Sequence, residues 1–147
     1  MIKIICVGKI KEDYLKKAID DYLNRINKYH KIQIIEIPDT NVEEEKDKIL
    51  KNINSKDYVI TLEIEGTPLN SIELSKKIDG TLIHYSTLTF IIGSSTGLSD
   101  EVKEQSNYHL SFSPLTFPHG LFRVILLEQI YRSFKIINNE TYHKWTM

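Results

Sequence analysis

The strongest constraint on the fold of this chain is a regular alternation, from one end to the other, between short β-rich runs and stretches of helical periodicity. A run rich in isoleucine predicts a first strand, and apolar residues at steps of three and four predict a helix after it. The same strand-then-helix pattern follows four more times. The predicted strands cover residues 2–7, 32–37, 58–63, 88–92 and 108–113.

Capping and turn residues mark the ends of several predicted elements. Gly66 and Pro68 predict a turn after the third strand, Asn70 or Ser71 is suited to cap the helix that follows, and Gly80 closes that helix. The longest helical pattern covers residues 121–137 and is apolar over more than one narrow stripe. We therefore expect two buried faces on this helix, and a second copy of the chain against one of them.

Five such alternations predict an α/β fold, with a mostly parallel sheet of five to six strands and helices on both faces. Ligands in sheets of this kind bind beyond the carboxyl ends of the strands. The loops in which to search for a site are therefore residues 8–12, 38–42, 63–69, 93–100 and 113–120.

Length and composition are typical of a small globular protein. At 147 residues the chain has the size of one domain, so we expect residues 1–147 to form a single domain. Its apolar runs fall far short of the ~20 residues that span a bilayer, and the one at the amino terminus is too short for a signal peptide. Cys6 is the single cysteine. We expect a cytoplasmic protein without disulfides, membrane contact or a metal site.

The charge of the chain is unevenly distributed. The net charge is −1, which provides no general attraction to nucleic acid. Residues 36–47 carry six acidic residues against one lysine, whereas residues 112–147 carry four basic residues against two acidic ones. An anionic partner would therefore bind through a local patch in the last quarter of the chain. The simpler alternative is an ordinary solvated surface.

Two loops have unusual residues. Residues 93–97, Gly-Ser-Ser-Thr-Gly, follow the fourth strand and lack both the lysine of a P-loop and the third glycine of a dinucleotide fingerprint. They predict a turn that brings bare backbone close to a ligand, or a tight turn without one. Residues 112–120 are stiffened by Pro114 and Pro118, with Leu115 and Phe117 suited to line an apolar pocket.

Ionisable and aromatic residues follow these loops. His119 is suited either to cap the last helix or to act as an acid or base near neutral pH. Arg123 and Arg132 are nine residues apart on that helix, so one of them is free to form an ion pair within the chain or between subunits. In the tail, Tyr142, His143 and Trp145 would stack on an RNA base if the tail does not simply fray.

Taken in order, these segments resemble one family. They are Ile5-Cys-Val-Gly-Lys9, Val59-Ile-Thr-Leu-Glu-Ile-Glu-Gly66, Phe90-Ile-Ile-Gly93, Gly97-Leu98, Leu110-Ser-Phe-Ser113, Leu115-Thr-Phe-Pro-His119, Arg123-Val124, Glu128-Gln-Ile-Tyr-Arg132 and Tyr142-His-Lys144. The combination resembles the RlmH family of large-subunit ribosomal RNA methyltransferases, in the SPOUT superfamily, over residues 1 to about 144. No single segment is specific, but their order is.

The resemblance implies a SPOUT-type fold with a C-terminal trefoil knot, a homodimer, and methylation of ring nitrogen 3 of a pseudouridine. The methyl donor would be S-adenosylmethionine, and the substrate would be 23S ribosomal RNA in the assembled ribosome rather than DNA. Knots are nearly absent from proteins, so periodicity does not predict one. By resemblance, the donor contacts are Leu62, Gly93, Phe112, Ser113, Pro114, Leu115, Thr116 and Phe117.

For the reaction itself we expect His119 or His143 near the ring nitrogen, Arg132 on a phosphate or a uracil oxygen, and Tyr142 against the base. The sequence departs from the family where Ser94 replaces a second glycine and where residues 145–147 extend the tail. The alternative function is a non-catalytic RNA-associated or nucleotide-sensing module with the same α/β architecture. A Rossmann oxidoreductase is disfavoured, because no glycine triplet follows the first strand.

Overall fold

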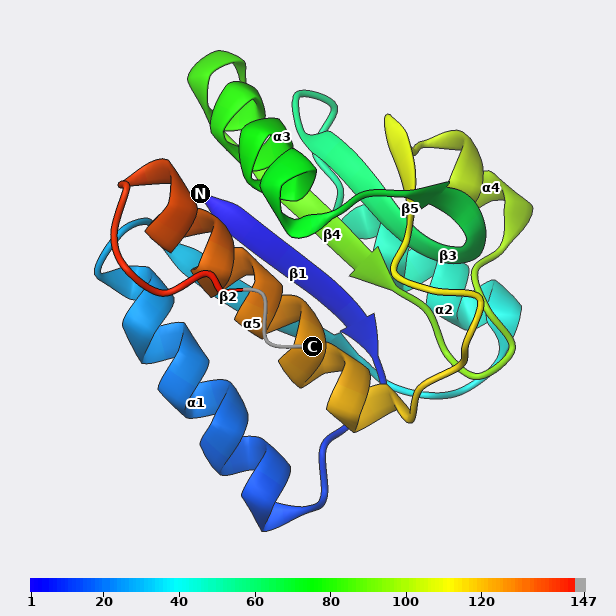
Figure 1. The fold of residues 1–147 in the computed structure, drawn as a ribbon. Coiled ribbons are helices and arrows are strands. Elements are labelled where there is room, and N and C mark those ends of the chain that lie inside the picture. Colours follow the sequence, from blue (N-terminus) through cyan, green and yellow to red (C-terminus); the bar gives the residue numbers. More distant parts are fainter. Residues whose placement is uncertain (145–147) are drawn as a thin grey trace.

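The structure is a computed structural model that describes residues 1–144, and its centre is a five-stranded sheet. Every pair of neighbouring strands is parallel, and the strand order is β2-β1-β4-β3-β5. The predicted parallel α/β sheet is therefore confirmed (Figure 1). The trefoil knot and the single-domain boundary stay predictions. The strands are β1 (Ile2–Val7), β2 (Ile32–Ile37), β3 (Tyr58–Pro68), β4 (Leu88–Ile92) and β5 (Tyr108–Ser111).

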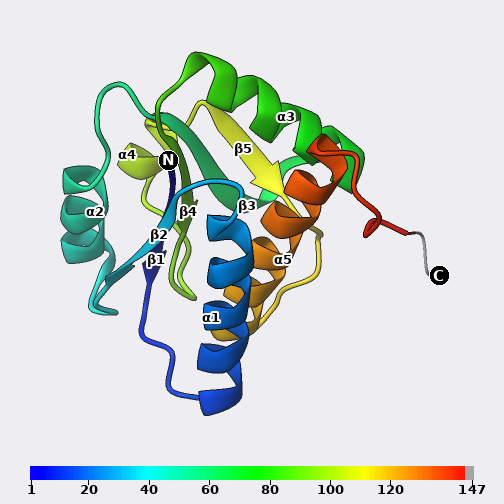
Figure 2. The ribbon, with the colours of Figure 1, turned by 90° about the vertical axis from the view of Figure 1, so that its left-hand side faces the viewer.

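Helices cover both faces of the sheet, as predicted (Figure 2). Three helices pack on one face, over a core that includes Ile4 and Phe90. The other two helices pack on the opposite face, over a smaller core that includes Ile5 and Ile91. Adjacent residues of one strand thus enter opposite cores, because strand side chains alternate between faces. The helices are α1 (Asp13–Asn27), α3 (Ser71–His84) and α5 (His119–Ile137) on the first face, and α2 (Val42–Lys51) and α4 (Asp100–Glu104) on the second.

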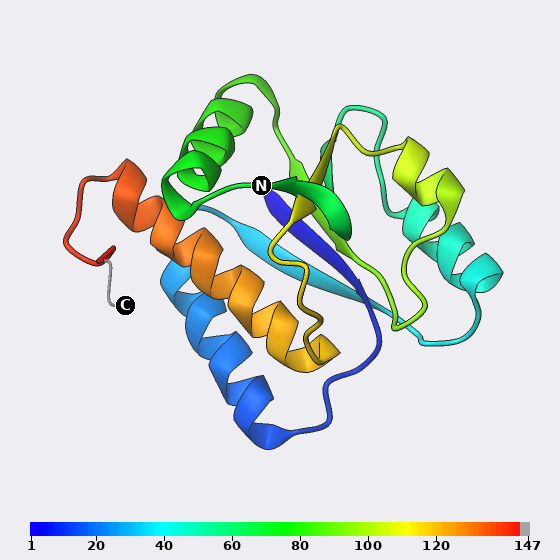
Figure 3. The same cartoon turned by 45° about the vertical axis from the view of Figure 1, so that its right-hand side comes forward.

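The last helix, α5, lies between α1 and α3 (Figures 1 and 3). Leu126, Leu127 and Ile130 are fully buried, and Tyr131 packs its ring against Tyr22 of α1 at 6.1 Å between centroids. The sheet and the two neighbouring helices therefore cover much of the apolar surface of α5, while Leu121 stays 42% exposed. The width of this surface does not by itself require a second copy, and the homodimer stays a prediction.

Strand β3 is longer than predicted. It continues to Pro68, with a shift in its pairing with β5 between Leu62 and Thr67. Gly66 lies inside the strand rather than in a turn. A Cβ atom at this position would stand 2.7 Å from the carbonyl oxygen of His109, so a larger residue would not fit. The glycine thus permits close contact with β5, and the turn prediction was wrong. Strand β5 itself ends at Ser111, two residues earlier than predicted.

Two helix ends also differ from their predictions. Helix α3 starts at a capping box formed by Asn70 and Glu73 and runs through Gly80 to His84. The glycine costs about 1 kcal/mol of helix propensity, but the flanking Ile78 and Thr81 are buried, and their packing outweighs it. Helix α5 begins at His119 rather than at residue 121, directly after Pro118. Within residues 1–144, no helix has the length and apolarity needed to cross a membrane.

A buried ion pair joins the edge of the core to the loop before β3. Lys3 Nζ lies 2.9 Å from Asp57 Oδ2, and both side chains are less than a tenth exposed. Lys3 also donates to the carbonyl oxygen of Asn52 at 2.6 Å, and the Thr89 hydroxyl donates to Asp57 at 3.1 Å. Burying two charges has a desolvation cost that the attraction between Lys3 and Asp57 alone would not offset. The additional hydrogen bonds help to compensate for this cost.

Removal of one partner from this pair should be costly. In Asp57→Ala, Lys3 stays buried without a counter-charge, so we expect the free energy of unfolding to fall by about 3–5 kcal/mol. Urea denaturation followed by circular dichroism measures this change. Asp21→Ala, which breaks the exposed pair with Arg25, is the control and should leave the midpoint nearly unchanged. Equal effects of the two substitutions would contradict the assignment.

Candidate active site

A cavity of about 600 Å³ opens at the carboxyl ends of β3, β4 and β5. This is the edge at which parallel α/β sheets bind ligands, and the volume is in the range of small-molecule sites. Its walls are the bulged part of β3, the loop after β4, the loop between β5 and α5, and the first turn of α5. The lining includes Leu62, Glu63, Ile64, Gly93, Ser94, Leu98, Lys103, Leu110, Phe112, Ser113, Leu115, Thr116, Phe117, His119 and Phe122.

The loop after β4 is closed tightly on itself. Gly97 has a φ of +83°, which favours glycine, and its N–H donates to the Ser94 carbonyl oxygen at 2.8 Å. A Cβ atom on Gly93 would stand 2.9 Å from both the backbone of Gly97 and the side chain of Leu98. The two glycines are thus required by the loop itself. A ligand could still approach the backbone of Gly93, but such an approach is not needed to explain why these two positions are glycines.

Ser94, where the sequence departs from the family pattern, is held by its own loop. Its hydroxyl lies 2.8 Å from the Thr96 hydroxyl and accepts from the Thr96 N–H at 3.3 Å. Ser94 and Gly97 also form an isolated β-bridge. The serine side chain is thus engaged in closing the turn, and the substitution leaves the loop tightly folded.

Aromatic rings form the opposite wall. Phe122, on the first turn of α5, packs edge-on against Phe112 at 5.1 Å and is stacked with Phe117 at 5.7 Å. The loop between them is ordered by the Ser113 hydroxyl, which accepts from the Leu115 N–H at 2.9 Å. The Leu115 side chain is 71% exposed. The wall is therefore aromatic, apolar and partly open to solvent, which suits a planar ring system.

Most of the residues predicted to bind the methyl donor meet at this cavity, although they come from three separate segments. Pro114 is the exception, since it is not among the lining residues. His119 also lines the cavity. It is the first residue of α5 and does not cap the helix, because Pro118 occupies the N-cap position without a side-chain bond. The predicted donor contacts that line the cavity are Leu62, Gly93, Phe112, Ser113, Leu115, Thr116 and Phe117.

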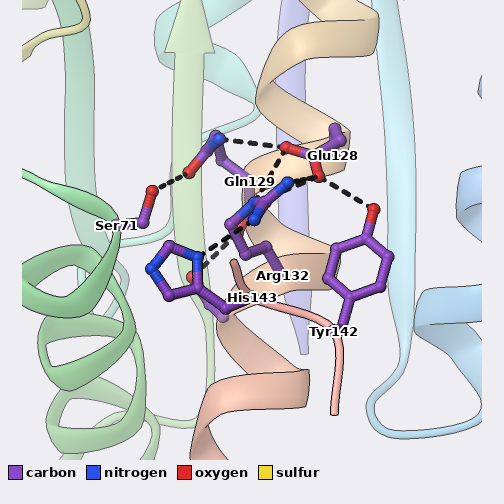
Figure 4. Close-up of polar contacts among 7 residues, drawn as sticks. Ser71, Glu128, Gln129, Arg132, Tyr142 and His143 are labelled. Carbon is purple, nitrogen blue, oxygen red and sulfur yellow. Dashed lines mark hydrogen bonds and ion pairs between the residues drawn. The ribbon is translucent and has the colours of Figure 1, made fainter. Parts of the chain in front are cut away.

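The other predicted reactive residues form a second cluster at the far end of α5 (Figure 4). Arg132 donates to both carboxylate oxygens of Glu128, from Nε to Oε1 at 3.3 Å and, in the shortest bond, from Nη2 to Oε2 at 2.8 Å. The Tyr142 hydroxyl donates to the same carboxylate at 2.9 Å, and Arg132 Nη1 lies 3.0 Å from His143 Nδ1. The three predicted residues are therefore brought together around Glu128.

Glu128 is the centre of this cluster, although it was not among the residues predicted to act in the reaction. It also accepts from Gln129, whose amide oxygen accepts in turn from the Ser71 hydroxyl of α3 (Figure 4). The spacing of Glu128 and Arg132, four residues apart on a helix, is the signal that would have predicted their ion pair. Their side chains are about one fifth exposed, so the pair is screened less than a surface pair.

The start of the tail is packed rather than frayed. The Tyr142 ring contacts Tyr131 at 4.9 Å between centroids, and the Arg132 guanidinium lies 5.0 Å from the Tyr142 ring. Burial and the hydrogen bond to the Glu128 carboxylate raise the pKa of Tyr142, so its hydroxyl stays protonated and donates. The prediction that the tail frays is thus wrong for Tyr142. The predicted base stacking by Trp145 lies outside the described residues.

The cavity and the cluster are separated along one helix. His119 and Arg132 are thirteen residues apart on α5, which corresponds to about 20 Å at 1.5 Å per residue. One chain therefore does not bring His119 together with Arg132, Tyr142 and His143. The set predicted as one catalytic site is divided in two by the geometry of the helix.

Arg123, the other arginine of α5, has a structural role. Its side chain is 3% exposed, and Nη1 donates to Glu36 Oε2 at 2.6 Å while Nη2 donates to the carbonyl oxygen of Gly8 at 3.2 Å. Both arginines thus form ion pairs within the chain, and that of Arg123 ties α5 to the ends of β1 and β2.

Comparison with known families bears on what the cavity does. Residues 1–143 match the family described as "Predicted SPOUT methyltransferase". The matched range contains the residues of both the cavity and the cluster around Glu128. The chain belongs to the SPOUT methyltransferase family.

Named relatives of this SPOUT methyltransferase are similar over almost their whole length. "Ribosomal RNA large subunit methyltransferase H" of Clostridium botulinum (strain Alaska E43 / Type E3) is 50% identical, over 97% of this chain and 99% of its own. The protein of Clostridium tetani with the same name is 48% identical with the same coverage. A protein of Methanococcus vannielii, provisionally given that name, is 52% identical with the same coverage. The resemblance to the RlmH family is confirmed.

A more distant solved structure shares the fold. It is described as "a probable methylase family protein" from Haemophilus influenzae Rd KW20 and aligns with 98% of this chain and 70% of its own. The TM-score is 0.61 at 15% sequence identity, so this likeness supports the architecture alone.

The closed loop of this SPOUT methyltransferase yields a stability prediction. In Gly93→Ala the added methyl group would overlap the Gly97 backbone, and we expect a loss of about 1–3 kcal/mol in the free energy of unfolding. Ser94→Ala is the adjacent control, because it removes only a partly exposed hydroxyl and should have a much smaller effect. Chemical denaturation measures both variants. A neutral Gly93→Ala would show that the loop relaxes without cost.

Proposed function

We propose that this SPOUT methyltransferase transfers the methyl group of S-adenosylmethionine to ring nitrogen 3 of a pseudouridine in 23S ribosomal RNA, within the assembled ribosome in the cytoplasm. The observation that carries the proposal is the cavity at the strand ends, where donor contacts predicted from three distant segments meet. Its support from the comparisons is a set of nearly full-length relatives at about half identity, named for ribosomal RNA methylation.

The lining of the cavity fits an adenosine-type methyl donor. The rings of Phe112, Phe117 and Phe122 offer an apolar surface for a purine, and Gly93 lines the same cavity without a side chain. When bound, S-adenosylmethionine supplies an electrophilic methyl group on a positively charged sulfur. The task of the chain is then to hold the donor and the ring nitrogen in line and to exclude water, a proximity effect worth several kcal/mol.

The cluster around Glu128 fits the RNA side of the reaction. Glu128 holds Arg132 by a bidentate ion pair, which presents the remaining guanidinium N–H groups in a defined direction. We assign Arg132 to a phosphate or a uracil oxygen and Tyr142 to contact with the base. With a net charge of −1, the protein depends on the shape of the assembled ribosome more than on general charge attraction.

The ring nitrogen must also lose a proton, and we assign its acceptance to His119 or His143. His119 lies at the cavity, and His143 lies beside Arg132. A general base of this kind contributes about 10²–10⁴-fold to a rate. The two histidines belong to the two separated parts of the site, so the choice between them depends on how those parts meet.

A homodimer brings the two parts together. Because His119 at the cavity and Arg132 in the cluster are about 20 Å apart along α5, we propose that the cluster of one subunit completes the cavity of the other. A two-fold axis makes this exchange reciprocal, so that a dimer contains two equivalent composite sites. It is this separation, and not the apolar width of α5, that motivates the dimer.

Single substitutions test the proton acceptor. We expect His119→Ala or His143→Ala to lower methylation of ribosomes by about 10²-fold or more, because the ring nitrogen then loses its proton unaided. Mass spectrometry of the modified ribosomal RNA, with S-adenosylmethionine present, measures the product. His84→Ala, at the exposed end of α3, is the control and should retain full activity.

Two outcomes would count against the proposal in different ways. Full activity in both His119→Ala and His143→Ala would exclude the histidines as proton acceptors but leave the methyltransferase function in place. Absence of S-adenosylmethionine binding in calorimetry at millimolar concentration would instead favour the non-catalytic RNA-associated module.

Mixing of two inactive variants tests the composite site. If His119 is the proton acceptor, His119→Ala damages the cavity and Arg132→Ala damages the cluster, so each homodimer should be inactive. A mixed dimer retains one intact site, formed by the cavity of the Arg132→Ala subunit and the cluster of the His119→Ala subunit. After unfolding and joint refolding we expect about a quarter of the wild-type activity, since half of the dimers are mixed and each has one site of two. No recovery, or light scattering that shows a monomer, would contradict the shared site.

A further inference from the structure

A pair of opposite charges at the cavity has no role in the function proposed above. Glu63, in the bulge of β3, and Lys103, on α4, both line the cavity, and Lys103 Nζ lies 4.0 Å from Glu63 Oε1. The Glu63 side chain is 16% exposed and that of Lys103 is 41% exposed. At this separation the two groups attract each other but are too far apart for a hydrogen bond.

The Glu63 carboxylate is held by neighbours on its other oxygen. The hydroxyl of Thr61, which is fully buried, donates to Glu63 Oε2 at 2.6 Å. The ring nitrogen Nδ1 of His109, on β5, is hydrogen-bonded to the same oxygen. Because Oε2 is fixed by two partners, the direction of Oε1 toward the cavity and Lys103 is fixed as well. A surface glutamate with a free side chain would not be positioned in this way.

The irregular pairing of β3 and β5 creates this arrangement. Regular pairing stops at Leu62 opposite Leu110 and resumes at Thr67 opposite the same residue, so residues 63–66 are left out of the ladder. The Ser111 hydroxyl donates to the carbonyl oxygen of Ile64 at 2.8 Å and holds the excluded segment in place. Bulges commonly redirect a side chain beside a functional site, and here the redirected side chain is Glu63.

We propose that Glu63 and Lys103 form the subsite for the zwitterionic amino-acid end of the methyl donor. Glu63 Oε1 accepts from the α-ammonium group, Lys103 donates to the α-carboxylate, and His109 is a positioning residue that acts through Glu63. This inference rests on the proposed function. In a zwitterionic ligand the ammonium group pairs with Glu63 and the carboxylate pairs with Lys103, so that no charge is left unpaired at the cavity wall.

An RNA phosphate fits this position less well than an amino acid. Glu63 and Glu65 both line the same wall of the cavity, and two carboxylates repel a phosphate. Lys103 is held within 4.0 Å of one of them, so its charge is partly compensated already. A zwitterion matches both signs of charge at this wall.

Calorimetry with two ligands isolates the amino-acid end. S-adenosylhomocysteine and 5′-methylthioadenosine share the adenosine and a neutral thioether, but only the first carries the amino acid. We expect the wild-type protein to bind S-adenosylhomocysteine at least about tenfold more tightly, since hydrogen bonds to charged groups have this magnitude. Glu63→Gln and Lys103→Met should each weaken S-adenosylhomocysteine about tenfold. Their affinity for 5′-methylthioadenosine should stay at the wild-type value, which also shows that the variants are folded.

His109 has a separate readout. His109→Ala should weaken S-adenosylhomocysteine selectively, because Glu63 loses a hydrogen bond that fixes its direction. His109→Asn should recover most of the affinity, since the asparagine amide can donate from nearly the same position as Nδ1. Glu104→Gln is the matched control: it removes the same charge next to Lys103, but Glu104 is exposed and is not among the cavity-lining residues.

The outcomes separate this inference from the function on which it rests. If the wild-type protein binds neither ligand, the donor site itself is wrong. If it binds both ligands equally well, or if Glu63→Gln weakens both equally, the donor site stands and the amino-acid subsite is overturned. A selective loss in the Glu104→Gln control would likewise overturn it, because a general charge effect would then explain the result.

Discussion

Burial of a parallel sheet on both faces is the constraint on which the rest of this structure depends. Alternate residues of β1 and β4 enter two different cores, so neither strand can shift by one residue without exchanging the two. With the register fixed, the carboxyl ends of β3, β4 and β5 meet at one edge. Loops far apart in the sequence then share a cavity, and helix α5 is confined between α1 and α3.

Two features arise from how the chain departs from regular elements at that edge. The bulge in β3 removes residues 63–66 from the ladder and brings Glu63 beside His109 and Lys103. The turn at residues 93–97 closes so tightly that its first and last residues are glycines. Both irregularities cost regular hydrogen bonds, and both line the cavity. Their coincidence at one place forms the cavity that we propose as the methyl-donor site.

Helix α5 connects the cavity to the cluster around Glu128 and also keeps them apart. A straight helix fixes the distance between its two ends, so His119 and Arg132 cannot approach each other within a chain. A composite site between two copies resolves this separation without any change in the fold. The same rigidity that stabilises the core by packing Leu126 and Ile130 is therefore the basis for proposing a partner subunit.

The periodic and ordered features of the sequence were sufficient to predict the parallel α/β sheet, its helices on both faces and, through the order of motifs, the family. Local patterns carry these features because they depend on neighbours a few residues away. Gly66 and Gly80 were misinterpreted because their surroundings are tertiary: one lies against the backbone of β5, and the other lies in a helix held by buried neighbours. The i, i+4 spacing of Glu128 and Arg132 contains their ion pair. The packing of Tyr142, the Glu63–His109 contact and the division of the reactive residues between two places depend instead on distances across the fold, which no spacing along the chain contains.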